Sequence, residues 1–276
     1  MTTTTEPVGA LLRHWRERRR RSQLDVSIAA ELSTRHLSCI ETGRANPSRD
    51  MIRRLCDELD VPLRERNTIY LAGGYAPVHT ERPFADLGAA RAAVEAVLTG
   101  LEPNPALAVN VRWELLAANR ATELFLGGAA GEPAQDGAGR PFNVLRATLH
   151  PEGLAGHILN LAQWRAHVLR RVRRQLERTS AAGLAELLAE LESYPAPPQS
   201  DRAAAPIAPD GPEHDLVVPL RLATEYGELA LLYTTTVFGS PKDVTLDEIA
   251  IETFFPADPR TAALLQAAAG RPEASG

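Results

Sequence analysis

The chain has 276 residues, 44% of them hydrophobic, and a formal net charge of −5 at pH 7, and this length is sufficient for two domains with separate cores. Residues 1–75 contain 13 Arg against 10 Asp and Glu, whereas the remainder contains 17 Lys and Arg against 25 Asp and Glu. The N-terminal residues lack the regions of a secretory signal peptide and no apolar run approaches the ~18 residues of a membrane span, so we expect a cytoplasmic protein that does not enter a membrane.

The N-terminal part predicts an all-α domain of five helices at residues 8–77. The first helix covers Val8–Arg19, the fourth begins at Ser48, and the fifth runs from Pro62 to Gly73-Gly74. Residues 78–85 are expected to be a linker. The net positive charge of residues 1–75 and the net negative charge of the remainder are typical of a nucleic-acid-binding domain joined to a separate regulatory domain.

The second and third helices lie in the segment Ser22–Gly43, which predicts two short helices joined by a tight turn. Ser22 and Asp25 have the spacing of a capping box, and Ser33 is a second N-cap. The core-facing apolar positions leave four side chains on the outer face of the second of these helices: Thr34, Arg35, His36 and Ser38. The major groove of DNA accepts such polar and bidentate side chains, so the segment predicts a helix-turn-helix that binds double-stranded DNA.

The C-terminal part mixes strands and helices, and we expect one domain at residues 86–270. Helices are predicted at Asp86–Thr99, Asn119–Phe125, Phe142–Leu149, Glu152–Arg178, Ala181–Ser193 and Asp258–Ala269, and strands at Ala106–Val111, Trp113–Ala118, Asp215–Thr224 and Glu228–Phe238. Gly127–Gly139 and the Pro- and Ala-rich residues 195–213 are predicted to be flexible loops.

The segment Val244–Phe255 supports two interpretations. Thr245 and Glu248 have the spacing of a capping box, whereas the alternation of Ile249, Ile251 and Thr253 indicates a strand. We prefer the strand, because two strands, several helices and three strands is the order of a PAS-like sensor fold. The predicted fold class is therefore α+β: a five-helix domain followed by an antiparallel sheet with flanking helices.

The N-terminal segment resembles the phage-repressor type (XRE family) of helix-turn-helix domain. The resemblance includes Arg44, Asn46-Pro47-Ser48 and the run 51–59. The runs 62–67 and 72–77 narrow it to MmyB-like transcriptional regulators, which join such a domain to a C-terminal ligand-binding domain. One residue departs from the pattern: the turn residue that is usually glycine is Glu31, where a left-handed backbone costs about 1 kcal/mol without glycine.

The resemblance implies roles for individual residues. Gln23, Thr34 and Arg35 occupy the family's positions for contacts around the base edges, and Ser33, Thr42 and Asn46 occupy those for contacts with the DNA backbone. Arg44 is better placed for a phosphate than for a base. The resemblance also implies a homodimer on a palindromic operator, because one helix-turn-helix domain covers one half-site.

A small hydrophobic, fatty-acid-like ligand is the further implication of the resemblance, with no cofactor. The apolar stripe of the long helix and the facing sheet residues are consistent with a pocket and equally with a filled core. The candidate pocket residues are Leu107, Val109, Trp113, Ile158, Leu161, Trp164, Val168, Leu231, Tyr233 and Phe254.

Several polar groups of the C-terminal part have ordinary explanations. The cluster Arg165, Arg170, Arg171, Arg173, Arg174 and Arg178 is best interpreted as a solvated helix face, with a dimer contact or an acidic ligand head group as alternatives. Asn119 is interpreted as an N-cap. His150, His157 and His167 match no compact metal-ligand spacing, so we expect no metal site.

Catalytic signatures are missing from the sequence. It contains no Gly-x-Ser-x-Gly, no phosphate-cradling glycine loop and no His-Glu-x-x-His. From the predicted helix-turn-helix and the family resemblance we predict a bacterial transcription regulator, and from the missing catalytic motifs we predict that it is not an enzyme. Two alternatives remain open: an antitoxin-like helix-turn-helix protein that contacts another protein, and a DNA-binding protein with a catalytic C-terminal domain.

Overall fold

The computed structural model describes residues 6–122, 141–179, 181–195, 218–239 and 241–269. The loop expected at 127–139 lies outside these ranges, as do residues 196–213 of the loop expected at 195–213 and the part of the expected 119–125 helix beyond residue 122. The described chain forms two units, the first made of residues 6–82 and 241–247 and the second of residues 83–239 and 248–269. In the described part of the chain, no helix has the length and apolar character needed to cross a bilayer.

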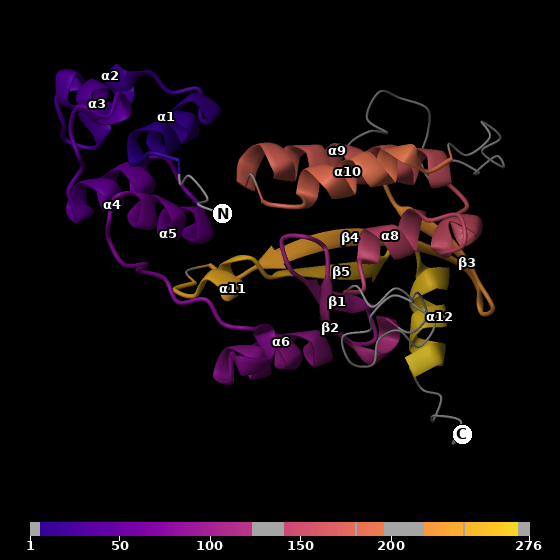
Figure 1. Cartoon of the computed structure of the whole chain (residues 1–276). Helices are drawn as coiled ribbons and strands as arrows, with labels where there is room; N and C mark the ends of the chain where they lie inside the picture. The colour runs from indigo at the N-terminus through magenta and orange to yellow at the C-terminus, as the bar shows by residue number, and fades with distance from the viewer. Residues whose placement is uncertain (1–5, 123–140, 180, 196–217, 240, 270–276) are drawn as a thin grey trace. The chain divides into compact units, whose positions relative to one another are not determined.

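The first unit contains a bundle of five helices (Figure 1). They are α1 (Val8–Arg18), α2 (Gln23–Ala29), α3 (Thr34–Glu41), α4 (Arg49–Glu58) and α5 (Leu63–Ala72). The serine caps act as the sequence predicts: Ser22 forms a capping box with Asp25, and the Ser33 side chain accepts a hydrogen bond from the backbone N–H of His36. Trp15, Leu37 and Ile40 are fully or almost fully buried among these helices.

Two backbone positions define how α1 and α2 meet α3. A methyl group at Gly9 would lie 2.0 Å from the carbonyl oxygen of Ile40, so only glycine allows α1 to pack this closely on α3. Between α2 and α3, Glu31 has φ 56°, which is the left-handed conformation that the family pattern assigns to glycine. The turn is therefore kept, and the non-glycine residue bears its conformational cost.

A short segment from the C-terminal part of the sequence completes the first unit. This segment includes α11 (Val244–Asp247), and the backbone N–H of Val244 donates to the carbonyl oxygen of Thr80 at 2.8 Å. The carboxylate of Asp243 accepts from the hydroxyl of Thr80 at 3.0 Å and from Nε of Arg82 at 3.2 Å. The expectation that 244–255 is one strand was therefore wrong over 244–247, because these residues form a helical turn here.

The second unit is built on one five-stranded antiparallel sheet with strand order β2-β1-β5-β4-β3. The strands are β1 (Ala106–Val109), β2 (Leu115–Ala118), β3 (Leu220–Thr224), β4 (Gly227–Val237) and β5 (Ala250–Pro256). β1 and β5, the first and last strands in the sequence, pair with each other in the middle of the sheet. This is the PAS-like arrangement expected from two strands, helices and three strands.

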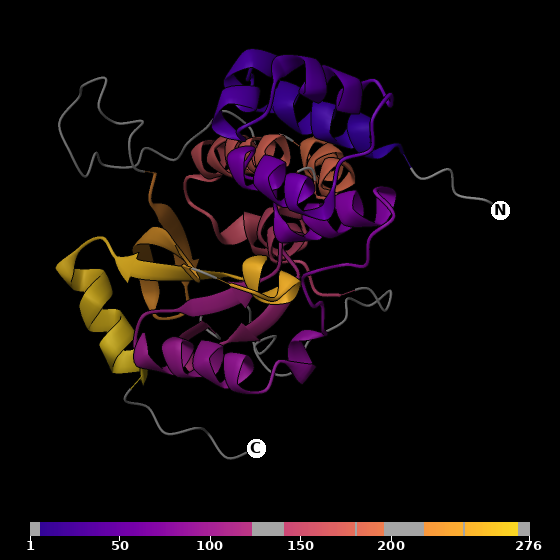
Figure 2. The ribbon, with the colours of Figure 1, turned by 90° about the vertical axis from the view of Figure 1, so that its left-hand side faces the viewer.

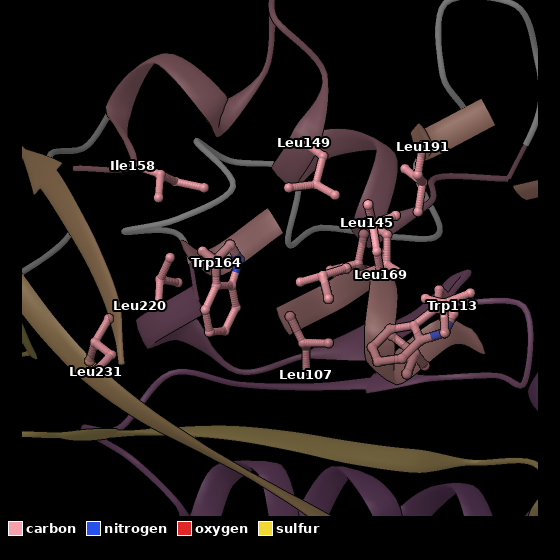
Figure 3. Packing of buried hydrophobic residues seen from close by; sticks show 14 of the residues in the cluster. Leu107, Trp113, Leu145, Leu149, Ile158, Trp164, Leu169, Leu191, Leu220 and Leu231 are labelled. Atoms are coloured by element: carbon pink, nitrogen blue, oxygen red, sulfur yellow. The ribbon is translucent and has the colours of Figure 1, made fainter. Parts of the chain in front are cut away.

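Helices cover both faces of this sheet (Figures 1 and 2). One face carries α8 (Val144–Leu149), α9 (Leu161–Thr179) and α10 (Leu184–Ser193), and the other carries α6 (Ala89–Gly100) and α12 (Pro259–Ala269). Short 3-10 turns occur at Phe84–Asp86, Arg120–Thr122 and Leu154–His157. Between α8, α9 and the sheet, Leu107, Trp164 and Leu169 belong to one apolar cluster (Figure 3).

The predicted long helix at 152–178 was wrong in its first turns. Residues 154–157 form a 3-10 turn, and α9 begins only at Leu161. Between them the chain is extended and pairs with β3: Ile158 bridges Leu222, and the N–H of Leu159 donates to the carbonyl oxygen of Arg221 at 2.8 Å. These backbone hydrogen bonds to the edge strand β3 replace the helical hydrogen bonds that the spacing of apolar residues alone predicts.

Asn119 has a larger structural role than the predicted N-cap. Its side-chain oxygen accepts from the N–H of Ala106 at 2.9 Å, and its amide donates to the carbonyl oxygens of Leu98 and Asn104. The buried side chain thus ties α6 to the start of β1, and these bonds use its hydrogen-bonding groups within the fold.

Candidate functional site

The outer face of α3 carries the predicted DNA-binding residues. Arg35 is exposed next to the N-terminus of the helix, and Thr34, His36 and Ser38 are partly exposed. The hydroxyl of Thr34 lies 3.0 Å from that of Ser27 on α2, which ties the two helices together at this face. A guanidinium presented in this way can donate two hydrogen bonds to a guanine in the major groove.

The flanking positions are also accessible. Ser33, Thr42, Arg44 and Asn46 are all exposed, and Arg44 and Asn46 lie in the loop that follows α3. The hydroxyls of Ser33 and Thr42 have local partners, since Ser33 caps α3 and Thr42 donates to the carbonyl oxygen of Ser38 at 2.7 Å. Arg44 is thus an exposed positive charge beside the outer face of α3, as a phosphate contact requires.

Gln23 is held by a buried ion pair. The guanidinium of Arg16 donates to both carboxylate oxygens of Glu41, at 2.6 and 2.9 Å, and the amide of Gln23 donates to the same carboxylate at 2.7 Å. The pair raises the pKa of Arg16 above its ordinary value, mainly through the hydrogen bond to Glu41. Because Gln23 is the first residue of α2, this network fixes the N-terminus of α2 relative to α1 and α3.

The second unit has a partly open cavity of about 40 Å³ between the sheet and the helices α8 and α9. A single water needs roughly 10–15 Å³ of such space, so the cavity has room for a compact molecule but not for a long chain. Six of the predicted pocket residues line it: Leu107, Trp113, Trp164, Val168, Tyr233 and Phe254.

Four predicted pocket residues do not line this cavity. Val109, Ile158 and Leu231 are buried in the apolar cluster, and Leu161 packs against that cluster at the start of α9. Six residues that were not predicted do line it: Val144, Leu145, Thr148, His167, Arg171 and Glu252. Arg171 lies seven residues after Trp164, a spacing that puts both residues on one helix face, but this spacing alone does not show that an arginine faces a cavity.

Arg171 and Glu252 form the polar end of the cavity. The guanidinium donates to both carboxylate oxygens, at 2.7 and 2.5 Å, and also to the hydroxyl of Thr235 at 2.6 Å. It also lies over the rings of Trp113 and Tyr233, 4.5 and 4.9 Å from the ring centres. Burial lowers the pKa of Arg171, but the hydrogen bonds and charge of Glu252 outweigh this effect, so its pKa lies above the ordinary value.

Trp113 adds conformational strain to this end of the cavity. It has φ 65°, a left-handed conformation that costs a bulky residue on the order of 1–3 kcal/mol. The backbone is held on both sides, since the N–H of Trp113 donates to the carbonyl oxygen of Asn110 at 2.9 Å and its carbonyl oxygen accepts from the N–H of Val144 at 3.0 Å. The indole nitrogen donates to the side-chain oxygen of Gln175 at 2.8 Å.

His167 and Tyr233 form a second polar pair in the lining. Nε2 of His167 lies 2.5 Å from the Tyr233 hydroxyl, and the His167 ring stacks on Trp164 at 5.6 Å. Burial, followed by the charges of Arg170, Arg171 and neighbouring arginines, lowers the pKa of His167. Burial raises the pKa of Tyr233. Both groups are therefore uncharged at neutral pH.

The arginine cluster of α9 is only partly a solvated face. Arg170, Arg174 and Arg178 are exposed as expected, whereas Arg171 turns to the cavity. The prediction was wrong for Arg171 because its buried partner, Glu252, is distant in sequence. Within the ranges that the structure describes, no three His, Cys, Asp or Glu side chains are grouped closely enough to hold a metal ion.

Two family models match the chain. Residues 7–69 match the model described as "Helix-turn-helix domain", and residues 90–268 match the one described as "MmyB-like transcription regulator ligand binding domain". No curated protein matches the chain. Among solved structures, it is similar to "Structure of an RNA-binding Light-Oxygen-Voltage Receptor" with a TM-score of 0.30 and 14% identity, over 97% of this chain and 64% of that one. The chain thus spans less than two thirds of that protein's length.

Proposed function

The chain belongs to the family of helix-turn-helix proteins with an MmyB-like ligand-binding domain, and we propose that it regulates transcription in a bacterial cytoplasm by binding a palindromic operator as a homodimer. The observation that carries the proposal is the exposed outer face of α3, with Arg35 next to its N-terminus and Arg44 beside it. Arg35 is the base reader, and Arg44 neutralises a phosphate.

The proposed homodimer follows from the size of the helix-turn-helix domain of one chain. A single recognition helix covers one half-site, and two-fold pairing places two such helices about one DNA turn apart on a palindrome. Two half-sites multiply the specificity that one helix provides, which a regulator requires among many competing genomic sites.

The second unit binds a small apolar molecule and does not convert it. The lining is mostly apolar, and its charged groups are already paired. The apolar part of a fatty-acid-like molecule suits this lining, although about 40 Å³ is too small for a long chain unless side chains move. Such a ligand changes DNA affinity only if it binds one conformation of the protein better than another.

A mobility-shift assay with DNA from the protein's own promoter region tests the DNA-binding part. We expect retardation at low salt and a steep loss of affinity as salt rises. No retardation at low salt would favour a role in protein contact. Native mass spectrometry of the purified protein tests the remainder: two chains per complex and an unchanged small molecule are expected, whereas turnover of that molecule would indicate an enzyme.

A further inference from the structure

One hairpin of the chain contributes to both units. β4 and β5 belong to the second unit, whereas residues 241–247 between them, which we call the clasp, belong to the first. The chain therefore passes between the units at 82–83 and again on either side of the clasp. A displacement of these two strands acts on the first unit through the covalent chain.

The β4–β5 ladder forms part of the cavity wall. Tyr233 of β4 and Phe254 of β5 are paired across it and line the cavity. The next pair on the same face, Thr235 and Glu252, binds the guanidinium of Arg171 and thereby ties the ladder to α9. Because the cavity between α9 and the sheet measures only about 40 Å³, an apolar chain of several carbons enters it only if these walls move apart.

Short connections join this ladder to the clasp. The last pair of the ladder is Val237 with Ala250, and residues 248 and 249 alone separate the clasp from β5. Two residues span at most about 7 Å, and Ile249 is fully buried, so the connection has little slack. A displacement of β5 is therefore transmitted to the clasp rather than absorbed before it.

Directional hydrogen bonds dock the clasp in the first unit. The N–H of Val244, which is fully buried, donates to the carbonyl oxygen of Thr80 at 2.8 Å. The carboxylate of Asp247 accepts from the N–H of Leu63, the first residue of α5, at 3.3 Å. Such bonds hold over a narrow range of distances and angles, so they fit one position of the strand ends and weaken when β5 moves.

From this connectivity we infer that a ligand in the cavity releases the clasp, and that this release lowers the affinity of the protein for DNA. The inference rests on the proposed ligand-sensing function and names the step by which the ligand acts. While the clasp is docked, the hairpin and the chain at 82–83 both restrain the DNA-binding unit. After its release the chain at 82–83 alone restrains it. The two DNA-binding units of a homodimer then sample more orientations and lose affinity for two half-sites at a fixed spacing.

Hydrogen exchange of the full chain, followed by NMR, measures the release. The probe is octanoate, whose binding is first established by isothermal titration calorimetry. The amides of Val244 and Leu63 donate across the docking contact, so we expect both to exchange at least about threefold faster with octanoate bound. Ile52, fully buried in α4, provides the internal control and should be unaffected.

Removal of one carboxylate of the clasp separates release from ligand binding. Asp243→Ala removes the acceptor of Thr80 and Arg82 and leaves the cavity lining unchanged. We expect octanoate to lower the DNA affinity of the unaltered chain at least about fivefold and that of this variant less than about twofold, with equal octanoate affinities. Glu81→Gln is the matched control, because it weakens an exposed pair with Arg64 in the same segment and should keep the full response.

Val168→Phe tests the coupling without a ligand. Val168 lines the cavity from α9, and a larger side chain there pushes α9 and the sheet apart. This variant should show the faster exchange of the Val244 amide in the absence of octanoate. The measurement does not depend on whether Asp243→Ala folds.

Three results would overturn the inference. A change of DNA affinity with octanoate, but no faster exchange of the clasp, would reject the clasp and leave the sensor function in place. A full response of Asp243→Ala to octanoate would show that the clasp is dispensable. Failure of octanoate to bind, with slow exchange of the clasp also in Val168→Phe, would reject the coupling together with the proposed sensor, while retardation of promoter DNA would preserve the DNA-binding part.

Discussion

Glu41 at the end of α3 and Arg16 on α1 form a buried, two-bond ion pair, with N–O distances of 2.6 and 2.9 Å. The side chains are 2% and 11% exposed, so water screens this pair little. The same carboxylate accepts a hydrogen bond from the amide of Gln23, so Glu41 on α3 links α1 and α2, two of the other helices of the first unit.

Replacement of Glu41 by alanine should destabilise the first unit strongly. The change leaves Arg16 buried without its anion, and loss of one partner from such a pair costs about 3 kcal/mol or more. Denaturant unfolding measures the loss. Glu17→Ala is the matched control, because its pair with Arg13 is about half exposed and should leave the unfolding midpoint unchanged. Similar midpoints for both variants would contradict the assigned role of Glu41.

Arg35→Ala and Arg44→Ala should weaken DNA binding in different ways. Loss of a bidentate base contact at Arg35 should cost about 1–3 kcal/mol and relax the preference for one base pair. Loss of a phosphate contact at Arg44 should weaken binding to all sequences alike and lower the salt slope by about one. Mobility-shift titrations over a salt series, with the operator and its single-base variants, distinguish the two. A sequence preference unchanged by Arg35→Ala would exclude it as a base reader.

Glu31→Gly should stabilise the protein. The residue has φ 56°, where removal of Cβ relieves about 1 kcal/mol of strain. Its ion pair with Arg54 is long, at 3.7 Å, and the carboxylate is mostly exposed, so little is lost with it. Glu31→Ala keeps Cβ and should give no gain in the same thermal unfolding experiment. An equal rise in melting temperature for both variants would attribute the effect to the lost charge instead.

The stability of the protein should fall as the pH is lowered below about 6.5, in part because of His167. Burial lowers the pKa of this imidazole from its ordinary value of 6.5. Between the pKa of the unfolded chain and the lower pKa of the native state, the unfolded chain binds the proton more readily. The contribution of His167 to the free energy of unfolding is therefore complete above pH 6.5 and decreases as the pH falls toward the native pKa.

His167→Gln should therefore flatten this dependence in denaturant unfolding at pH 7.5, 6.5 and 5.5. Some slope should remain, since burial also lowers the pKa of His79 in the first unit. An NMR titration of the His167 ring with a midpoint at or above 6.5 would disprove the assignment.

The helix-turn-helix was predictable because its signals are local. Ser22, Ser33 and Ser48 each cap a helix within three residues of the group they bind, and such spacing is visible in the sequence. The left-handed turn at Glu31 followed from the family pattern rather than from the residue type, since glutamate gives no such signal.

The cavity was predictable only in part, because its walls depend on pairings between distant residues. The break before α9 arises because residues 158–160 form hydrogen bonds with β3, about 60 residues away. The spacing of apolar residues along the helix gives no information about such a distant pairing. Arg171 was assigned to solvent for the same reason, since its carboxylate partner lies 81 residues further along the chain. Val144, Leu145 and Thr148 were missed because α8 is too short for its inner face to be identified from sequence.

The first unit is discontinuous in sequence, and this affects how the protein can be dissected. A fragment that stops at residue 82 contains every residue of the helix-turn-helix but lacks Asp243 and Asp247. Thr80, Arg82 and the N–H of Leu63 would lose the carboxylates that bind them. The first unit therefore cannot be isolated intact by a single cut in the chain. A short peptide covering residues 241–247, supplied separately or fused through a loop, would be needed to complete it.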